Sequence, residues 1–145
     1  MLGAIIAKRE VRKAFDRINR QDLDAVVGMF TDDGVFEFPA GTILGGRHEG
    51  REAVQAWFDR WFTRMTSIHF TLKRVAAAKP FALGASNVIY AEWDLEETTR
   101  EGTTHRLSGM TALNVEGGKA KLVKDYIFDQ NVIADIWSQE KEQVG

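Results

Sequence analysis

The order of predicted elements in this 145-residue sequence indicates an α+β fold, with most helices in its first half and an antiparallel sheet in its second half. Apolar residues recur at helical spacing up to about residue 65 and alternate at strand spacing after residue 67. The later strands follow one another through hairpin signals. A long antiparallel sheet that bends around a helix leaves a concave apolar space, where small ligands usually bind. We therefore expect one domain, spanning residues 1–145, with an internal apolar pocket.

The first two predicted helices precede a short strand. Apolar side chains in residues 5–20 form one stripe of an amphipathic helix, and Asp22 can cap a shorter helix that follows. Turn-forming residues 31–34 then lead to a strand over residues 35–38, which Pro39 ends.

A glycine-rich segment and a third helix separate this strand from the rest of the sheet. Four glycines predict a loop over residues 39–50, and residues 51–65 form a helix with a wide aromatic face. Beyond residue 67 the pattern predicts four strands and a terminal helix. These are strands over residues 69–78, 85–99, 104–115 and 120–128, and a helix over residues 132–143.

Composition excludes several functions. The formal net charge of −2, from 19 basic and 21 acidic residues, leaves no basic surface for nucleic acid. The absence of cysteine excludes disulfides, thiol catalysis and cysteine-bound metals. The apolar start of the chain is too short for a signal peptide, and no stretch reaches the roughly 18 apolar residues that span a bilayer. We therefore expect a cytoplasmic protein with no membrane or nucleic-acid partner.

Three motifs resemble the nuclear transport factor 2-like superfamily. They are Gln21-Asp22-Leu23-Asp24 leading through Met29-Phe30 to residues 31–34, then Gly50-Arg51-Glu52-Ala53-Val54, then Gly118-Lys119-Ala120 followed by Val123-Lys124-Asp125-Tyr126. The most similar branches are SnoaL-like polyketide cyclases, limonene-epoxide hydrolases and ketosteroid isomerases. The resemblance implies a cone-shaped, cystatin-like fold with a strongly bent sheet around helices. That superfamily includes enzymes, ligand binders and transport adaptors, so the fold leaves the function open.

Site residues of the cyclases and epoxide hydrolases carry over only in part. Both use a carboxylate on the last strand, seven residues after the hairpin glycine, and Asp125 matches that position. The epoxide hydrolases also use an arginine and an aspartate on the long middle strand, where this chain has Trp93 and Leu95. The resemblance therefore implies Asp125 as an acid–base group without that pair.

Ketosteroid isomerase residues are absent. The aspartate before the proline of the first strand matches Phe38, and the tyrosine of the first helix matches Phe15. The second pocket acid falls at Met110 or Thr111, and the additional histidine of the cyclases also falls at Met110. The resemblance thus argues against steroid isomerisation, and only Asp125 matches a functional position.

The pattern of the last strand is compatible with two orientations of Asp125. This residue shares a face with Val123 and Ile127, and a pocket position would raise its pKa toward neutrality and suit it to acid–base work. Alternatively, Asp125 is exposed and the opposite face, with Tyr126 and Phe128, forms the core. Alternation leaves both open because both faces are apolar.

The histidines are weaker candidates. His105 shares a face with Leu107 and Thr111 and could be the acid–base partner of Asp125, or it could be polar surface. His69 begins a strand and could reach the pocket mouth, whereas His48 lies in the glycine-rich segment and is expected to be exposed. Their spacing predicts no metal site.

Aromatic and branched side chains are expected to line the pocket. Glu37 would join them if a bulge at Pro39 turned it inward, although an outward charge between Phe36 and Phe38 is the commoner pattern. The acidic face of residues 92, 94 and 96 is expected in solvent or at a subunit interface. The expected lining comprises Phe15, Ile18, Glu37, Trp57, Phe58, Trp61, His69, Trp93, Leu95, Leu107, Val123 and Ile127.

Two functions remain open at this point. The first is an enzyme, without cofactor or metal, that cyclises, isomerises, dehydrates or hydrolyses a small apolar molecule with Asp125 as general acid or base. The second is a non-catalytic binder or interaction protein with the same pocket, because no second catalytic residue is matched. The resemblance also implies a homodimer through the outer sheet face, near Val88 and Tyr90.

Overall fold

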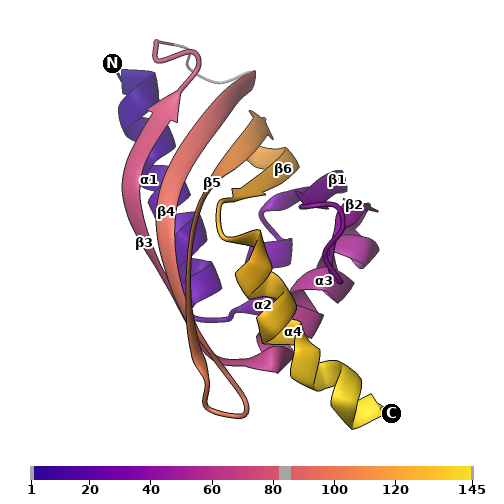
Figure 1. Ribbon diagram of the computed structural model, residues 1–145. Helices are drawn as coiled ribbons and strands as arrows, with labels where there is room; N and C mark the ends of the chain where they lie inside the picture. Colours follow the sequence, from indigo (N-terminus) through magenta and orange to yellow (C-terminus); the bar gives the residue numbers. More distant parts are fainter. Residues whose placement is uncertain (1, 82–85, 145) are drawn as a thin grey trace.

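The computed structural model describes residues 2–81 and 86–144 and has the α+β architecture that the sequence predicts. Within these ranges the elements are α1 (Leu2–Asn19), α2 (Leu23–Val27), β1 (Phe30–Phe38), β2 (Gly46–Glu49), α3 (Arg51–Arg64), β3 (Met65–Ala77), β4 (Ser86–Thr99), β5 (Thr104–Glu116), β6 (Lys119–Ile127) and α4 (Gln130–Val144). The strands form one open sheet in the order β2-β1-β6-β5-β4-β3 (Figure 1).

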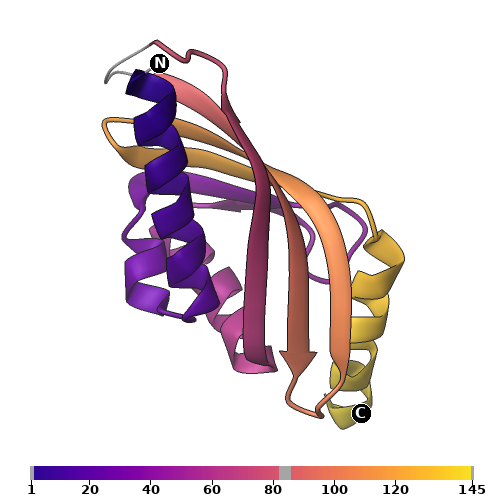
Figure 2. The same ribbon diagram turned by 90° about the vertical axis from the view of Figure 1, so that its left-hand side faces the viewer.

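The sheet bends strongly, as the resemblance implied. The long strands β3, β4 and β5 run together along the molecule, whereas β1 and β6 cross at an angle to their lower parts (Figure 2). Helix α1 packs against β3, and α1 and α4 lie at opposite sides of the molecule in the same view. No helix of the described ranges has both the length and the hydropathy needed to cross a bilayer.

The sheet is mixed, so the prediction of a purely antiparallel sheet is wrong. Strand β1 pairs parallel with β6, with Phe30 opposite Ala120 and Phe36 opposite Val123. The register shifts between Phe30 and Val35, and the residues expected to form a turn before the strand lie inside β1 at this irregularity. A pairing between segments so far apart in the chain leaves no local sequence signal, which is why it was not predicted.

Strand β2 lies within the segment that the sequence analysis assigned to a loop. Residues Gly46–Glu49 pair antiparallel with β1, with Val35 opposite Glu49 and Phe38 opposite Gly46. Gly46 and Gly50 have φ angles of 109° and 84°, so the two glycines turn the backbone at the two ends of a short strand. Glycine content here therefore marks strand ends as well as a loop.

Strand β4 follows the predicted alternation. Ile89, Trp93 and Leu95 are buried on its inner face. The acidic residues of the other face form ion pairs with basic side chains of the neighbouring strands, as Glu92 does with Arg74 at 2.9 Å. Two similar pairs, Asp94 with Lys73 and Glu96 with Arg106, complete the outer row. This acidic face therefore points away from the core.

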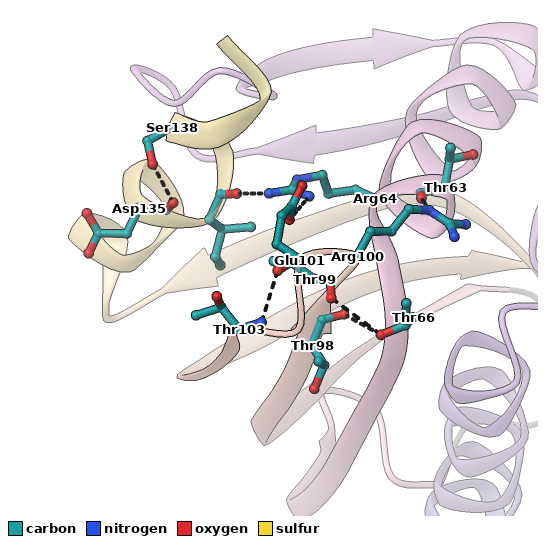
Figure 3. Close-up of polar contacts among 11 residues, drawn as sticks. Thr63, Arg64, Thr66, Thr98, Thr99, Arg100, Glu101, Thr103, Asp135 and Ser138 are labelled. Carbon is teal, nitrogen blue, oxygen red and sulfur yellow. Dashed lines mark hydrogen bonds and ion pairs between the residues drawn. The ribbon is translucent and has the colours of Figure 1, made fainter. Parts of the chain in front are cut away.

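Helix α4 is attached to the rest of the fold by a buried arginine. Arg64, at the end of α3, is only 8% exposed and donates from Nη1 to Oε2 of Glu101 at 2.5 Å. Its Nη2 donates to the carbonyl oxygen of Ile136 in α4 at 2.9 Å (Figure 3). The hydrogen bond from Arg64 lowers the pKa of Glu101. One side chain thus joins α3, the β4–β5 turn and α4.

Candidate functional site

A cavity of about 300 Å³ lies between α1 and the concave face of the sheet. Aromatic side chains from helices and strands form much of its wall, namely Phe15, Phe30, Phe36, Phe58, Trp61 and Phe70. The rings pack at tilted or edge-to-face angles, and Phe15 and Phe70 meet edge to face with centroids 5.0 Å apart. Polar side chains in the wall are few, and they include Glu10, Arg17, Asn87, Thr111 and Asp125. An apolar cavity with a few polar groups is typical of a small-molecule site.

Strand β6 directs Asp125 into this cavity. Asp125 and Val123 both line the cavity, whereas Tyr126 and Phe128 on the opposite face are 48% and 88% exposed. Of the two orientations that the sequence left open, the inward one is therefore correct. The apolar residues on the outer face, Tyr126 of β6 and Phe128 just after it, which made the alternation ambiguous, are exposed surface residues.

Two hydrogen bonds orient the carboxyl of Asp125. The hydroxyl of Thr111, directly opposite on β5, donates to Oδ1 of Asp125 at 2.6 Å. The indole Nε1 of Trp93 donates to Oγ1 of Thr111 at 2.9 Å. Because an indole N–H can only donate, the hydroxyl proton of Thr111 is directed to the carboxyl. The relay fixes the position of Oδ1 and leaves Oδ2 for a ligand.

A glycine makes this relay sterically feasible. Gly109 lies two residues before Thr111 on β5, and a Cβ at Gly109 would lie 2.8 Å from the Trp93 ring and 2.4 Å from the carbonyl oxygen of Tyr126. Because Gly109 has no side chain, the Trp93 ring packs directly on its backbone and reaches Thr111. Trp93 is predicted to line the pocket, but its ring lies behind Thr111, outside the cavity wall.

Burial raises the pKa of Asp125 to about 7 from its ordinary value of 3.8. The cause is loss of solvation, which disfavours the charged carboxylate, and the hydrogen bond from Thr111 offsets this effect only in part. At neutral pH both the acid and the carboxylate are therefore populated. A group in this condition can give or take a proton without cofactor or metal.

A second buried carboxyl lies behind the cavity wall. Glu97, on the inner face of β4, is 4% exposed, and its Oε2 accepts a hydrogen bond from Nε1 of Trp61 at 2.9 Å. Burial raises the pKa of Glu97 to about 7, against the opposing effects of the Trp61 hydrogen bond and the charge of Arg64. Glu97 is not among the site residues predicted from the sequence, although alternation from Trp93 places residue 97 on the buried face.

His105 is not a neighbour of Asp125. It lies opposite Glu97 in the register of β4 and β5, six residues along β5 from Thr111, or about 20 Å at the usual rise of a strand. Its Nδ1 is buried and has no hydrogen-bond partner among the described residues. The expected partnership between His105 and Asp125 is therefore wrong, because a shared strand face does not imply proximity along the strand.

The other two histidines and Glu37 also lie outside the cavity wall. His69 is exposed on β3, and His48 is half-buried with its Nε2 3.1 Å from the carbonyl oxygen of Leu44, although exposure was expected. Glu37 accepts from Nη1 of Arg47 at 2.6 Å and lies 3.6 Å from Nζ of Lys124. These partners hold Glu37 on the outer side of β1, so it does not turn inward.

The remaining lining predictions divide between cavity and core. Phe15, Ile18, Phe58, Trp61 and Val123 line the cavity with Asp125. Trp57, Leu95, Leu107 and Ile127 are buried in the core outside the cavity wall. In the described part of the chain no three His, Asp or Glu side chains lie close enough to hold a metal ion. Thr111 is not among the site residues predicted from the sequence, although it shares a strand face with Leu107, which places it on the inner face.

Comparisons with known proteins agree with this architecture. The chain resembles Bal32a from a soil-derived mobile gene cassette (17% identity over 93% of this chain and 98% of that one, TM-score 0.77). It also resembles SalBIII, an epoxide hydrolase/cyclase-like enzyme of pyran ring formation in the polyether salinomycin (22% identity, 90% and 96% covered, TM-score 0.73). A third similar structure is TerC co-crystallised with polyporic acid (16% identity, 90% and 96% covered, TM-score 0.69).

These structural similarities establish the fold. A search of curated protein sequences finds no match. The family model described as SnoaL-like domain matches residues 11–123, which include most residues of the cavity wall and most of the strands and end two residues before Asp125. The chain belongs to the family of SnoaL-like domains.

Proposed function

We propose that the protein is a cofactor-free enzyme that moves a proton on a small, mostly apolar organic molecule, with Asp125 as general acid or base. The observation that carries this proposal is a carboxyl with a pKa of about 7 in the wall of an apolar cavity. Such a pKa lies near the pH at which the protein would work, where acid–base catalysis is most efficient. Membership of the SnoaL-like family and the pyran-forming activity of SalBIII support a cyclase or isomerase type.

The geometry suggests how one carboxyl can serve both halves of such a reaction. The ionised form takes a proton from a carbon next to a carbonyl group, or from a hydroxyl that attacks within the same molecule. The resulting acid returns that proton to the enolate carbon or to the oxygen of the opened ring. Thr111 donates to Oδ1 throughout and stabilises the charged form, while aromatic side chains exclude water from the reacting atoms.

Asp125→Asn tests the proposal, because asparagine keeps the shape of the side chain and cannot exchange a proton. The substrate panel would contain enolisable ketones, hydroxy-epoxides and β-hydroxy ketones, together with any ligand that mass spectrometry finds on the purified protein. We expect turnover to fall by about 100-fold or more in this variant. Asp94→Asn, which alters an exposed carboxylate on the outer face, is the matched control. Undiminished turnover in Asp125→Asn would end the proposal.

The pH dependence of turnover distinguishes the two roles of Asp125. If the carboxylate acts as the base, the rate rises as the pH passes through about 7, and if the carboxylic acid acts first, the rate falls. In both cases the residual rate of Asp125→Asn should show no change with pH around 7.

A non-catalytic binding protein is the second candidate. It is favoured by the position of His105, which leaves Asp125 without a histidine partner in the cavity. Such a binder would show saturable binding of apolar ligands with no product. Asp125→Asn would then change only the affinity.

We also propose a homodimer through the outer face of the sheet. Exposed Tyr90 and Tyr126 contribute apolar area to this face, together with Phe128 just after β6. Light scattering after gel filtration should give twice the chain mass, and Tyr126→Glu should give the monomer mass. A monomeric wild-type chain at micromolar concentration would contradict this proposal.

A further inference from the structure

Arg17 is a half-buried cation in the wall of the apolar cavity. It lies in the last turn of α1, and its neighbours Ala14 and Ile18 also line the cavity. Its guanidinium forms no ion pair and no side-chain hydrogen bond with any residue of the described ranges. A guanidinium carries five N–H donors, and none of the Arg17 donors is both fully buried and unpartnered, so they remain accessible to a ligand that displaces water.

The other basic residues of α1 differ from Arg17. Lys13 bonds to Glu10 at 3.0 Å, and Arg12 is exposed on the outer side of the helix. A basic residue in the last turn is favourable for the helix dipole wherever it points, and that effect does not require a position in the cavity wall. The side chain of Glu10, which also lines the cavity, has its charge offset by Lys13. Arg17 is thus a cation of this wall that has no carboxylate partner among the residues that the structure describes.

Asp125 lies in the sheet wall of the same cavity, whereas Arg17 lies in the helix wall. Aromatic side chains such as Phe15 and Phe58 also line the space. A ligand that satisfies all three features has an anionic end for Arg17, an apolar body for the rings and a reacting group for Asp125. A cavity of about 300 Å³ is at the lower end of the usual range for ligand sites, which favours a body of one or two rings.

We infer that Arg17 binds the carboxylate of the substrate, so that the substrates are small apolar monocarboxylic acids. A planar guanidinium matches a carboxylate through two parallel N–H···O bonds, which lysine cannot form. This inference rests on the proposed function for the reacting end of the substrate. Binding of the substrate carboxylate to Arg17 can be measured without turnover. It adds a determinant of substrate class and of substrate orientation.

A pair of probes with the same shape tests the inference. Calorimetric titration at pH 8 and low salt would compare 2-naphthylacetate with neutral 2-naphthylacetamide. We expect wild-type protein to bind the acid about tenfold more tightly or better, and Arg17→Met to bind both probes with affinities within about twofold of each other. Arg17→Lys should keep part of the preference. Arg12→Met removes the same charge from the exposed side of α1 and should keep all of it.

Three results would overturn the inference: equal affinity of wild-type protein for the two probes, an undiminished preference in Arg17→Met, and no binding of the acid at millimolar concentration. Circular dichroism of each Arg17 variant verifies the fold. The same titration with Asp125→Asn separates this inference from the proposed function. A preference for the acid in a protein that turns over no substrate ends the proposed function alone. Turnover of neutral substrates without any preference for the acid ends this inference alone.

Discussion

Replacing Asp125 with asparagine should stabilise the fold at alkaline pH and change it much less in acid. The pKa of Asp125 is raised by burial from 3.8 to about 7, so the folded protein favours the protonated carboxyl. The stability that this preference contributes is complete below about pH 3.8 and is lost as the pH rises to about 7. Each pH unit in this window costs about 1.4 kcal/mol, so the loss between pH 5 and pH 8 is about 2 to 3 kcal/mol.

Urea unfolding followed by tryptophan fluorescence at pH 5, 6, 7 and 8 would measure this difference. The free energy of unfolding of Asp125→Asn minus that of the wild type should increase by about 2 to 3 kcal/mol across the series. Glu97 has a similarly raised pKa, but it is present in both proteins and its effect cancels. Asp94→Asn, at an exposed site, should give a difference that does not vary with pH. A constant offset for Asp125→Asn across the series would refute the reasoning.

Three other substitutions test the surroundings of the cavity and the attachment of α4. Thr111→Val removes the donor to Asp125, so the pKa of Asp125 should rise by about 1 to 2 pH units in a carbon-13 NMR titration; an unchanged pKa would contradict the hydrogen bond. Gly109→Ala forces a Cβ against the Trp93 ring and should lower the free energy of unfolding by about 1 to 3 kcal/mol in urea, whereas wild-type stability would show that the contact is loose. Arg64→Met removes the bond to α4 and should accelerate amide hydrogen exchange in that helix by about tenfold or more; unchanged exchange would show that the helix is held by apolar packing alone.

Local signals predicted most of the fold, and nonlocal pairings were the part that escaped. Helix α2 begins after Asp22, whose carboxylate accepts from the backbone N–H of Ala25 as the capping prediction requires. The hairpin between β5 and β6 forms at Gly117 and Gly118, which both have positive φ. By contrast, β2 is only four residues long and lies among glycines, so propensity favoured a loop. Its strand character comes from pairing with β1.

The site was predicted in part, for physical reasons that differ from residue to residue. Asp125 was identified by resemblance, but its orientation needed the structure because Tyr126 and Val123 make both faces of β6 apolar. Thr111 could not be paired with it from sequence, since the register of β5 and β6 depends on the whole hairpin. Glu97 lies on the face of β4 that alternation marks as buried, but its hydrogen-bond donor, Trp61, is far away in the chain. Such a partner becomes visible only once α3 is packed on the sheet.

The parallel pair of β1 and β6 has a consequence for how the chain matures. Phe30 and its partner Ala120 are ninety residues apart, so β6 can join the sheet only after the strands and helices between them have been synthesised. Until then β6 does not cover Phe58 and the other aromatic rings of the helical wall. The nascent chain therefore exposes apolar surface that favours aggregation. A ligand of the cavity should therefore bind only after β6 has joined the sheet, and it should delay unfolding without hastening refolding.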